Sequence, residues 1–208
     1  EMCIRDRLLS GKLEESKDIF QDIIKKQPSH YKAHTNIGAI NLQLGKLDNA
    51  ELSFKNAIKY NPKFEIAFFN LGITQKKLGK LDEAEISFKE AINLRQDYIE
   101  AITNLGILLI EKNKLNEAEE CFNKIINYKP KFAEAYYNLG ITYGKLSKFD
   151  LAEVNYKKAL ELKPEFIDAD YNLRKIYRQN KFLSSIEKYK RENNKSVIHS
   201  GLDVNPFI

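Results

Sequence analysis

Apolar residues recur every three or four positions along most of the chain, which is the spacing of one face of an α-helix. Ala84, Phe88, Ala91 and Ile92 form one such set. Turn-forming residues such as Gly, Asn and Pro separate successive sets. The pattern therefore predicts an all-α chain of short helices joined by tight turns.

The same pattern returns every 34 residues, marked by the triplet Asn-Leu-Gly or Asn-Ile-Gly. The triplet begins at Asn36, Asn70, Asn104 and Asn138, and a degenerate copy begins at Asn172. An aromatic residue recurs at the same period, at Phe20, Phe54, Phe88, Phe122 and Tyr156. A fixed period held over most of a chain indicates one structural unit that is copied and stacked.

Each unit is predicted to hold two helices, joined by a glycine turn and closed by a proline. The turns are expected at Gly11, Gly45 and Gly79, and at Asn113 and Ser147 in the next two copies. Gly and Asn tolerate the left-handed backbone that ends a helix. The closing positions are Pro28, Pro62, Pro130 and Pro164, with Gln96 as the exception. We expect the recurring aromatic to fill the gap between neighbouring units.

This combination of markers resembles the tetratricopeptide repeat over about residues 8–193. The resemblance implies an α-solenoid of tandem helix-turn-helix hairpins that forms a right-handed superhelix. It divides the chain into a half repeat (8–30), four repeats (31–64, 65–98, 99–132 and 133–166), a degenerate repeat or cap (167–193) and a tail or linker (194–208).

Residues 1–7 break the pattern, and we interpret them as a sequencing or cloning artefact. The run from Glu1 to Asp6 reads as the translation of GAG-ATG-TGT-ATA-AGA-GAC, which resembles a transposon end used to prepare sequencing libraries. The alternative is a genuine but divergent first helix. If the artefact interpretation holds, the natural protein continues upstream.

Composition and charge limit the kinds of partner and the compartment that the sequence predicts. The net charge of +5 is spread over helix surfaces and is not gathered into a stripe, so we expect no nucleic-acid binding. No apolar run has the length of a membrane span, so we expect none. The two cysteines exclude a disulfide framework, and Cys121 is interpreted as a semi-buried filler. The default compartment is cytoplasmic.

The sequence offers little catalytic chemistry. His30 and His34 are four residues apart, but they straddle the break after Pro28 and lack a third ligand nearby. Packing explains His34. We find no phosphate-binding loop and no nucleophile motif. We therefore expect no catalytic residue, no cofactor and no metal site, and we predict a protein that is not an enzyme.

The binding hypothesis concerns one stripe on the first helix of each unit. It contains Asn36, Asn70, Asn104, Asn138 and Asn172, flanked by the apolar residues Phe69, Ile73, Tyr137, Ile141 and Tyr171. A carboxamide carries both a donor and an acceptor and can pair with a peptide backbone. The row resembles the Asn ladder in the repeat arm of peptide O-linked N-acetylglucosamine transferases, which implies backbone contact by these five residues. The alternative is structural, since Asn is common at this position across the repeat family.

The leading interpretation is a non-catalytic scaffold that binds an extended peptide or a partner helix in the concave groove. The runner-up is the substrate-recruiting arm of a larger modifying enzyme. A third hypothesis is self-association through the exposed end repeats. The basic clamp that heat-shock chaperone cofactors use for a terminal carboxylate is not expected, because Thr35, Ala39 and Asn104 occupy its positions.

Overall fold

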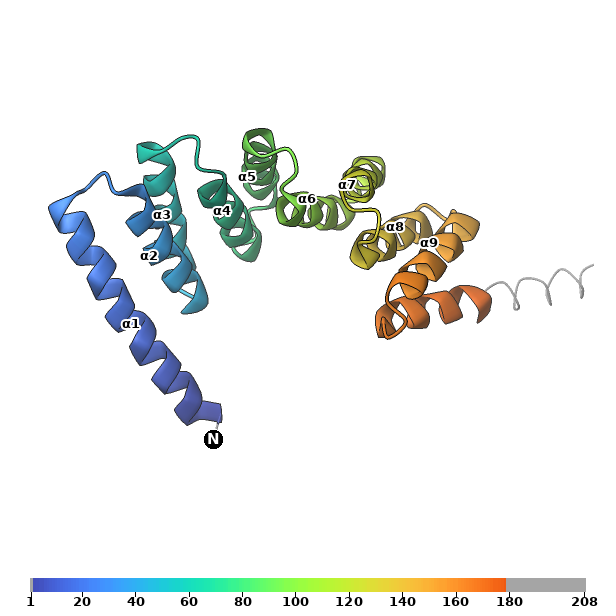
Figure 1. Ribbon diagram of the computed structural model, residues 1–208, viewed down its shortest axis with the longest axis horizontal. Helices are drawn as coiled ribbons and strands as arrows, with labels where there is room; N and C mark the ends of the chain where they lie inside the picture. Colours follow the sequence, from blue (N-terminus) through green and yellow to red (C-terminus); the bar gives the residue numbers. More distant parts are fainter. Residues whose placement is uncertain (1, 179–208) are drawn as a thin grey trace, which may run out of the picture. The chain divides into compact units, whose positions relative to one another are not determined.

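The computed structural model of the chain describes residues 2–178, with side chains from residue 11 onward. The regular structure of this part is helical throughout (Figure 1), which confirms the predicted all-α fold of tandem hairpins. The labelled helices are α1 (Met2–Lys26), α2 (Tyr31–Gln43), α3 (Leu47–Tyr60), α4 (Glu65–Lys77), α5 (Leu81–Leu94), α6 (Ile99–Glu111), α7 (Leu115–Tyr128), α8 (Ala133–Lys145) and α9 (Phe149–Leu162). Residues 167–178 are also helical. The remainder of the expected cap and the tail at 194–208 lie outside the described residues.

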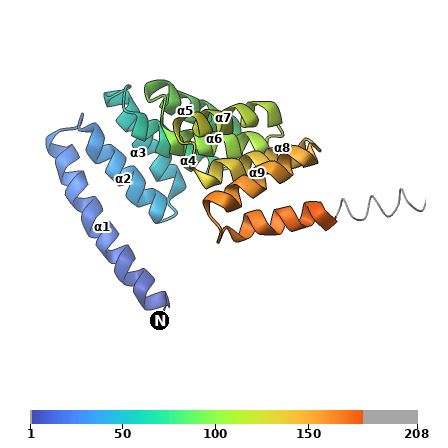
Figure 2. The same cartoon turned by 45° about the vertical axis from the view of Figure 1, so that its right-hand side comes forward.

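The helices pair in chain order. α2 packs against α3, α4 against α5, α6 against α7, and α8 against α9. The second helix of one pair also packs against the first helix of the next, as α3 does with α4 and α5 with α6. Figure 2 shows the same helices from a second direction. Contacts divide the chain into two compact units, residues 1–130 and 131–208, and each is described separately.

The predicted turns between paired helices have the left-handed backbone that their residues suggested. The φ angles are +72° at Gly45, +76° at Gly79, +58° at Asn113 and +59° at Ser147. In the first of these turns, the Lys46 N–H donates to the Asn41 carbonyl at 2.8 Å. This bond satisfies a carbonyl that the end of the helix would otherwise leave unpaired.

The turn expected at Gly11 is not formed, and that prediction was wrong. Gly11 lies inside α1, which runs unbroken from Met2 to Lys26. A continuous helix keeps every backbone hydrogen bond through this segment, and the penalty for an interior glycine is only about 1 kcal/mol. The other turns join two helices that pack against each other, and this packing is what favours the break.

The recurring aromatic packs most closely within its own repeat. A Cβ atom built on Gly72 would lie 2.7 Å from the Phe88 ring, so only glycine allows the ring so near the first helix. Gly38, Gly106 and Gly140 meet their own aromatic residues in the same way. The predicted contact between neighbouring repeats also exists, since Phe54 forms one buried cluster with Ala50 and with Leu71 of the next repeat.

The second helices end two residues before the closing position, whether or not it is a proline. α3 ends at Tyr60 before Pro62, and α5 ends at Leu94 although Gln96 follows. The repeat packing therefore sets the end of α5 without a proline. Among the described helices, none has both the length and the apolar character that crossing a bilayer requires.

Candidate peptide-binding surface

The first-helix stripe is defined here as the five recurring asparagines together with Phe69, Ile73, Tyr137, Ile141 and Tyr171. Two of these asparagines have the same side-chain geometry. The Asn70 Nδ2 donates to the Ile66 carbonyl at 3.0 Å, and the Asn104 Nδ2 donates to the Glu100 carbonyl at 2.8 Å. Each bond reaches back one helical turn and uses one of the two amide hydrogens. It therefore fixes the orientation of the carboxamide and leaves the other hydrogen and Oδ1 directed away from that bond.

The other three asparagines lie in different surroundings. Asn36 is exposed on α2, and Asn138 is half-buried on α8. In the second unit, the Asn172 Nδ2 donates to the Tyr137 hydroxyl at 3.3 Å. The five asparagines therefore recur regularly in the sequence, but their side chains are held in at least two different ways.

Two aromatic members of the stripe are largely used for packing. Phe69 lies 5.0 Å from Tyr98 and 6.2 Å from Phe88, measured between ring centroids. Tyr137 repeats this arrangement 68 residues later, at 4.7 Å from Phe166 and 6.0 Å from Tyr156. Burial raises the pKa of the Tyr137 hydroxyl, with a smaller contribution from Asp168. Both rings are half-buried, so only part of each is available to a partner.

The remaining apolar members differ in exposure. Tyr171 is 65% exposed and is the most accessible aromatic of the stripe. Ile73 and Ile141 are half-buried. Apolar contact with a partner therefore rests mainly on Tyr171 in the second unit and on Ile73 in the first.

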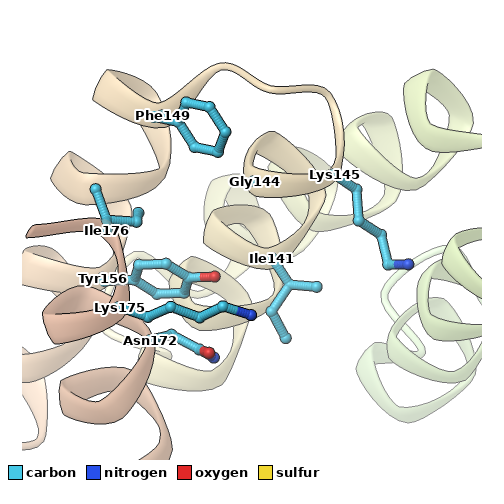
Figure 3. A pocket seen from close by; sticks show the side chains of 8 residues that line it. All are labelled: Ile141, Gly144, Lys145, Phe149, Tyr156, Asn172, Lys175 and Ile176. Atoms are coloured by element: carbon cyan, nitrogen blue, oxygen red, sulfur yellow. The ribbon is translucent and has the colours of Figure 1, made fainter. Parts of the chain in front are cut away.

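A pocket of about 500 Å³ opens beside the stripe in the second unit, between α8, α9 and residues 167–178 (Figure 3). Sequence reasoning did not predict it. Its lining residues are Ile141, Gly144, Lys145, Phe149, Tyr156, Asn172, Lys175 and Ile176. Burial raises the pKa of the Tyr156 hydroxyl to about 12, so this group remains a hydrogen-bond donor at neutral pH.

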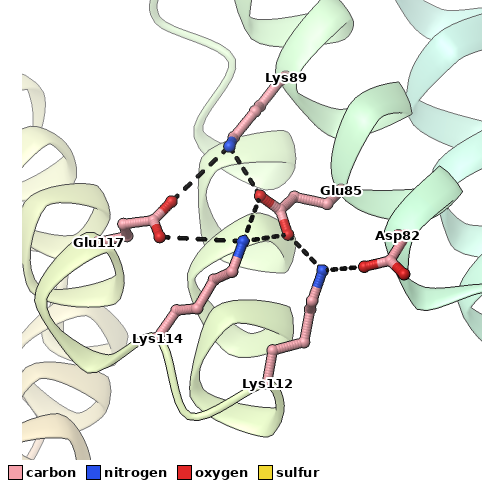
Figure 4. A network of polar contacts seen from close by, with 6 residues as sticks. All are labelled: Asp82, Glu85, Lys89, Lys112, Lys114 and Glu117. Carbon is pink, nitrogen blue, oxygen red and sulfur yellow. Dashed lines mark hydrogen bonds and ion pairs between the residues drawn. The ribbon is translucent and has the colours of Figure 1, made fainter.

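A buried carboxylate links two repeats on the second helices of the first unit (Figure 4). Glu85 of α5 is 6% exposed and accepts hydrogen bonds from Lys89 at 2.7 Å, from Lys112 at 2.6 Å and from Lys114 at 3.0 Å. Burial alone would raise the pKa of Glu85. The three lysines outweigh burial and lower that pKa to about 2.

The preceding repeat has the same link in a simpler form. Glu51 of α3 is 7% exposed and pairs with Lys55 of its own helix and with Lys80 of the next repeat, each at 2.6 Å. These hydrogen bonds lower the pKa of Glu51 despite its burial. Both links join a second helix to the turn of the following repeat, so they serve the stack and not a ligand.

The histidines and the described cysteine have structural surroundings. His30 accepts the Ala33 N–H at 3.0 Å and so caps α2. His34 stacks on Tyr60 at 5.3 Å, in agreement with the packing role expected from the sequence. Burial raises the pKa of the Cys121 thiol to about 11. Within the described residues, no three acidic, His or Cys side chains come together as a metal site.

Paired helices in a 34-residue register, with a glycine-aromatic contact in each pair, define a helical-repeat protein. Tetratricopeptide-repeat family models match residues 4–55, 66–98 and 133–166, and a further TPR-repeat model matches residues 38–79 and 108–147. The chain therefore belongs to the tetratricopeptide-repeat family. No curated protein matches the sequence significantly.

Several solved structures share the fold. YrrB, described as a TPR protein with an unusual peptide-binding site, is 24% identical and superposes with a TM-score of 0.71 over 81% of this chain and 88% of its own. MamA from Desulfovibrio magneticus is 21% identical, with a TM-score of 0.68 over 83% and 97%. A tetratricopeptide-repeat protein from Parabacteroides merdae is 22% identical, with a TM-score of 0.74 over 90% and 76%.

Proposed function

We propose that this chain is a non-catalytic binding module that holds an extended peptide along its first-helix stripe. The observation that carries the proposal is the common orientation of Asn70 and Asn104. Both carboxamides are anchored to the helix by one N–H, so little side-chain freedom is lost when a peptide binds. The peptide-binding site named for YrrB, which has the same fold, supports the proposal by analogy.

The physical basis is the pairing of a peptide backbone with a fixed row of amides. The free N–H and Oδ1 of each anchored Asn can donate to a peptide C=O and accept from a peptide N–H. Such contacts read the backbone, so the affinity should depend weakly on peptide sequence. The alternative of a recruiting arm in a larger enzyme uses the same residues, and a catalytic domain encoded in the same gene would distinguish it.

The test compares peptide binding by the unchanged chain with binding by Asn70→Ala/Asn104→Ala. Ala is the better helix former, so these substitutions should not unfold the helix. Loss of two to four hydrogen bonds, at about 0.5–1.5 kcal/mol each, should weaken binding by about 5-fold or more. Fluorescence polarisation with a set of unrelated peptides, capped at both ends, measures the change.

The matched control is Asn155→Ala. Asn155 makes the same bond, from its Nδ2 to the Leu151 carbonyl at 2.8 Å, but it lies on the second helix α9. We expect this variant to bind as the unchanged chain does. Equal binding by the double variant, or equal losses in the double variant and the control, would overturn the role of the stripe.

A further inference from the structure

We propose that the pocket beside Tyr156 in the second unit binds the carboxylate of an Asp or Glu side chain in the peptide. This inference rests on the proposed function and adds a preference for an acidic residue to it. The Tyr156 pocket is defined by the lining residues given above. Phe149 differs from the Leu of the earlier repeats only by a larger apolar side chain. Three other lining residues depart in ways that add space or hydrogen-bond donors.

The first departure creates the space. Gly144 stands where the earlier repeats carry Leu42, Lys76 and Ile110. Packing does not demand this glycine, because a Cβ atom added to it would meet nothing nearer than the Tyr156 hydroxyl, at the ordinary distance of 3.9 Å. A glycine inside a helix is destabilising by about 1 kcal/mol relative to Ala. The glycine is thus unfavourable for the helix, and its effect is to leave the pocket open.

The other two departures place donors in that space. Tyr156 adds a hydroxyl where the earlier repeats have Phe54, Phe88 and Phe122. Lys175 adds an ammonium group where they have the apolar residues Ala39, Ile73, Ile107 and Ile141. In Figure 3 the Tyr156 hydroxyl, the Lys175 ammonium group and the Asn172 carboxamide all point toward Ile141.

The charges around the pocket select an anion. Within the described residues, neither Lys145 nor Lys175 takes part in an ion pair. The nearby acidic side chains do not neutralise them. Glu134 pairs with Lys163 at 3.2 Å, and Asp168 lies seven residues before Lys175, about 10 Å along the helix. Among the described residues, no acidic side chain therefore pairs with either of these two lysines, and Lys175 lies on the same side of the pocket as the Tyr156 hydroxyl (Figure 3).

The rest of the lining suits the stem of an acidic side chain. Phe149, Ile176 and Ile141 are apolar and can contact its methylene groups. A carboxylate has two oxygens and can accept hydrogen bonds from both the Lys175 ammonium group and the Tyr156 hydroxyl. A volume of about 500 Å³ has room for a Glu side chain and part of its neighbour.

A small probe tests the pocket independently of longer peptides. The full chain, labelled with ¹⁵N, is titrated with N-acetyl-glutamate N-methylamide and, separately, with the glutamine analogue, while the Gly144 amide resonance is followed. Neither probe has a terminal carboxylate. We expect the glutamate probe to shift and saturate this resonance and the glutamine probe to leave it unchanged. Equal responses to the two probes, or no response to either, would overturn the proposal.

The variants restore the residues that the other repeats carry, so they should fold. Lys175→Ile removes a charge-assisted hydrogen bond and should weaken the glutamate probe about 10-fold, and Tyr156→Phe should weaken it about 3-fold to 10-fold. Lys131→Ile removes an exposed charge from elsewhere in the same unit and should have no effect. A loss of equal size in Lys131→Ile would show only general electrostatic attraction and would refute the site.

A second arm separates failure of the pocket from failure of the proposed function. Capped peptides that differ only by Glu or Gln at one position are compared on the unchanged chain and on Lys175→Ile. If peptides bind without a Glu preference, the proposed function stands and the pocket assignment fails. If only the small probe binds, at the Gly144 signal, the pocket stands and peptide binding along the stripe fails.

Discussion

Two glycines of α8 face the same tyrosine at very different distances. A Cβ atom on Gly140 would lie 2.6 Å from the Tyr156 ring, whereas one on Gly144 would lie 3.9 Å from the hydroxyl. Gly140 belongs to the repeated triplet and is required for close packing. Gly144 has no such requirement. The two positions therefore separate the steric need for glycine from its effect on helix stability.

Gly140→Ala should destabilise the protein by about 1–3 kcal/mol, because the new methyl group overlaps a ring that is buried against the helix. Gly144→Ala should instead stabilise it by up to about 1 kcal/mol, through better helix propensity. Urea unfolding followed by circular dichroism measures both changes. Destabilisation of similar size in both variants would mean that Gly144 also fills a packing role.

At the scale of the helix, the Glu85 link joins α5 to both ends of the next turn. Lys112 directly follows α6, and Lys114 directly precedes α7. A single carboxylate thus holds the turn that connects two helices of the following repeat. Replacing Glu85 by an uncharged residue removes the charge that the three lysines share, although Lys112 keeps its pair with Asp82, and Lys89 and Lys114 keep their longer contacts with Glu117.

Glu85→Gln should lower the unfolding free energy at neutral pH by about 2–3 kcal/mol, the value of lost charge-assisted hydrogen bonds. The exposed Glu90 of the same helix is the control, and Glu90→Gln should change stability by less than about 0.5 kcal/mol. Urea denaturation at neutral pH compares the two variants. Equal effects would contradict a special role for Glu85.

The same link predicts how stability depends on pH. The folded pKa of Glu85 is about 2 and its ordinary value is 4.5, so its contribution is fully present above pH 4.5 and is lost as the pH falls toward about 2. The difference in stability between the unchanged chain and Glu85→Gln should therefore be smaller at about pH 3 than at about pH 6. A difference that stays constant between these two conditions would argue against the lowered pKa.

The sequence predicted the helices better than the links between them. The 34-residue repeat allowed the Asn triplet, the aromatic residue and the turn to be predicted, because each is required by the local backbone or by packing within one repeat. The Glu85 link was missed because its two partners in the next repeat lie 27 and 29 residues away. A signal was available, since Glu51 and Glu85, like Lys80 and Lys114, are 34 residues apart.

The pocket was beyond prediction for a related reason. Gly144, Tyr156 and Lys175 are each visible as departures from the repeat, yet they lie on three different helical segments. Only the packing of those segments shows that the departures share one space.

The turn expected at Gly11 failed to form for the opposite reason. A local signal for a turn was present there, but the packed helical pair that favours the turn elsewhere was not.

Over the whole described chain, burial is unevenly distributed. The second helix α5 has five buried residues, Ala84, Glu85, Ser87, Phe88 and Ala91. From residue 11 onward, α1 has no fully buried side chain, and Phe20 is only half-buried where Phe88 is completely buried. In a repeat stack the stability of each helix depends on its interfaces with its neighbours. The two helices should therefore open with different free energies.

Amide hydrogen exchange measured by mass spectrometry should show this difference directly. α5 packs against both α4 and α6 and is held by the Glu85 link, so its amides should exchange only through extensive unfolding. The amides of α1 between residues 11 and 26 should exchange at least about tenfold faster, because opening this helix exposes little buried surface. Glu85→Gln should then speed exchange in α5 and leave α1 unchanged, since the link acts on one interface. Equal protection in the two helices would instead mean that the first unit unfolds as a single cooperative block.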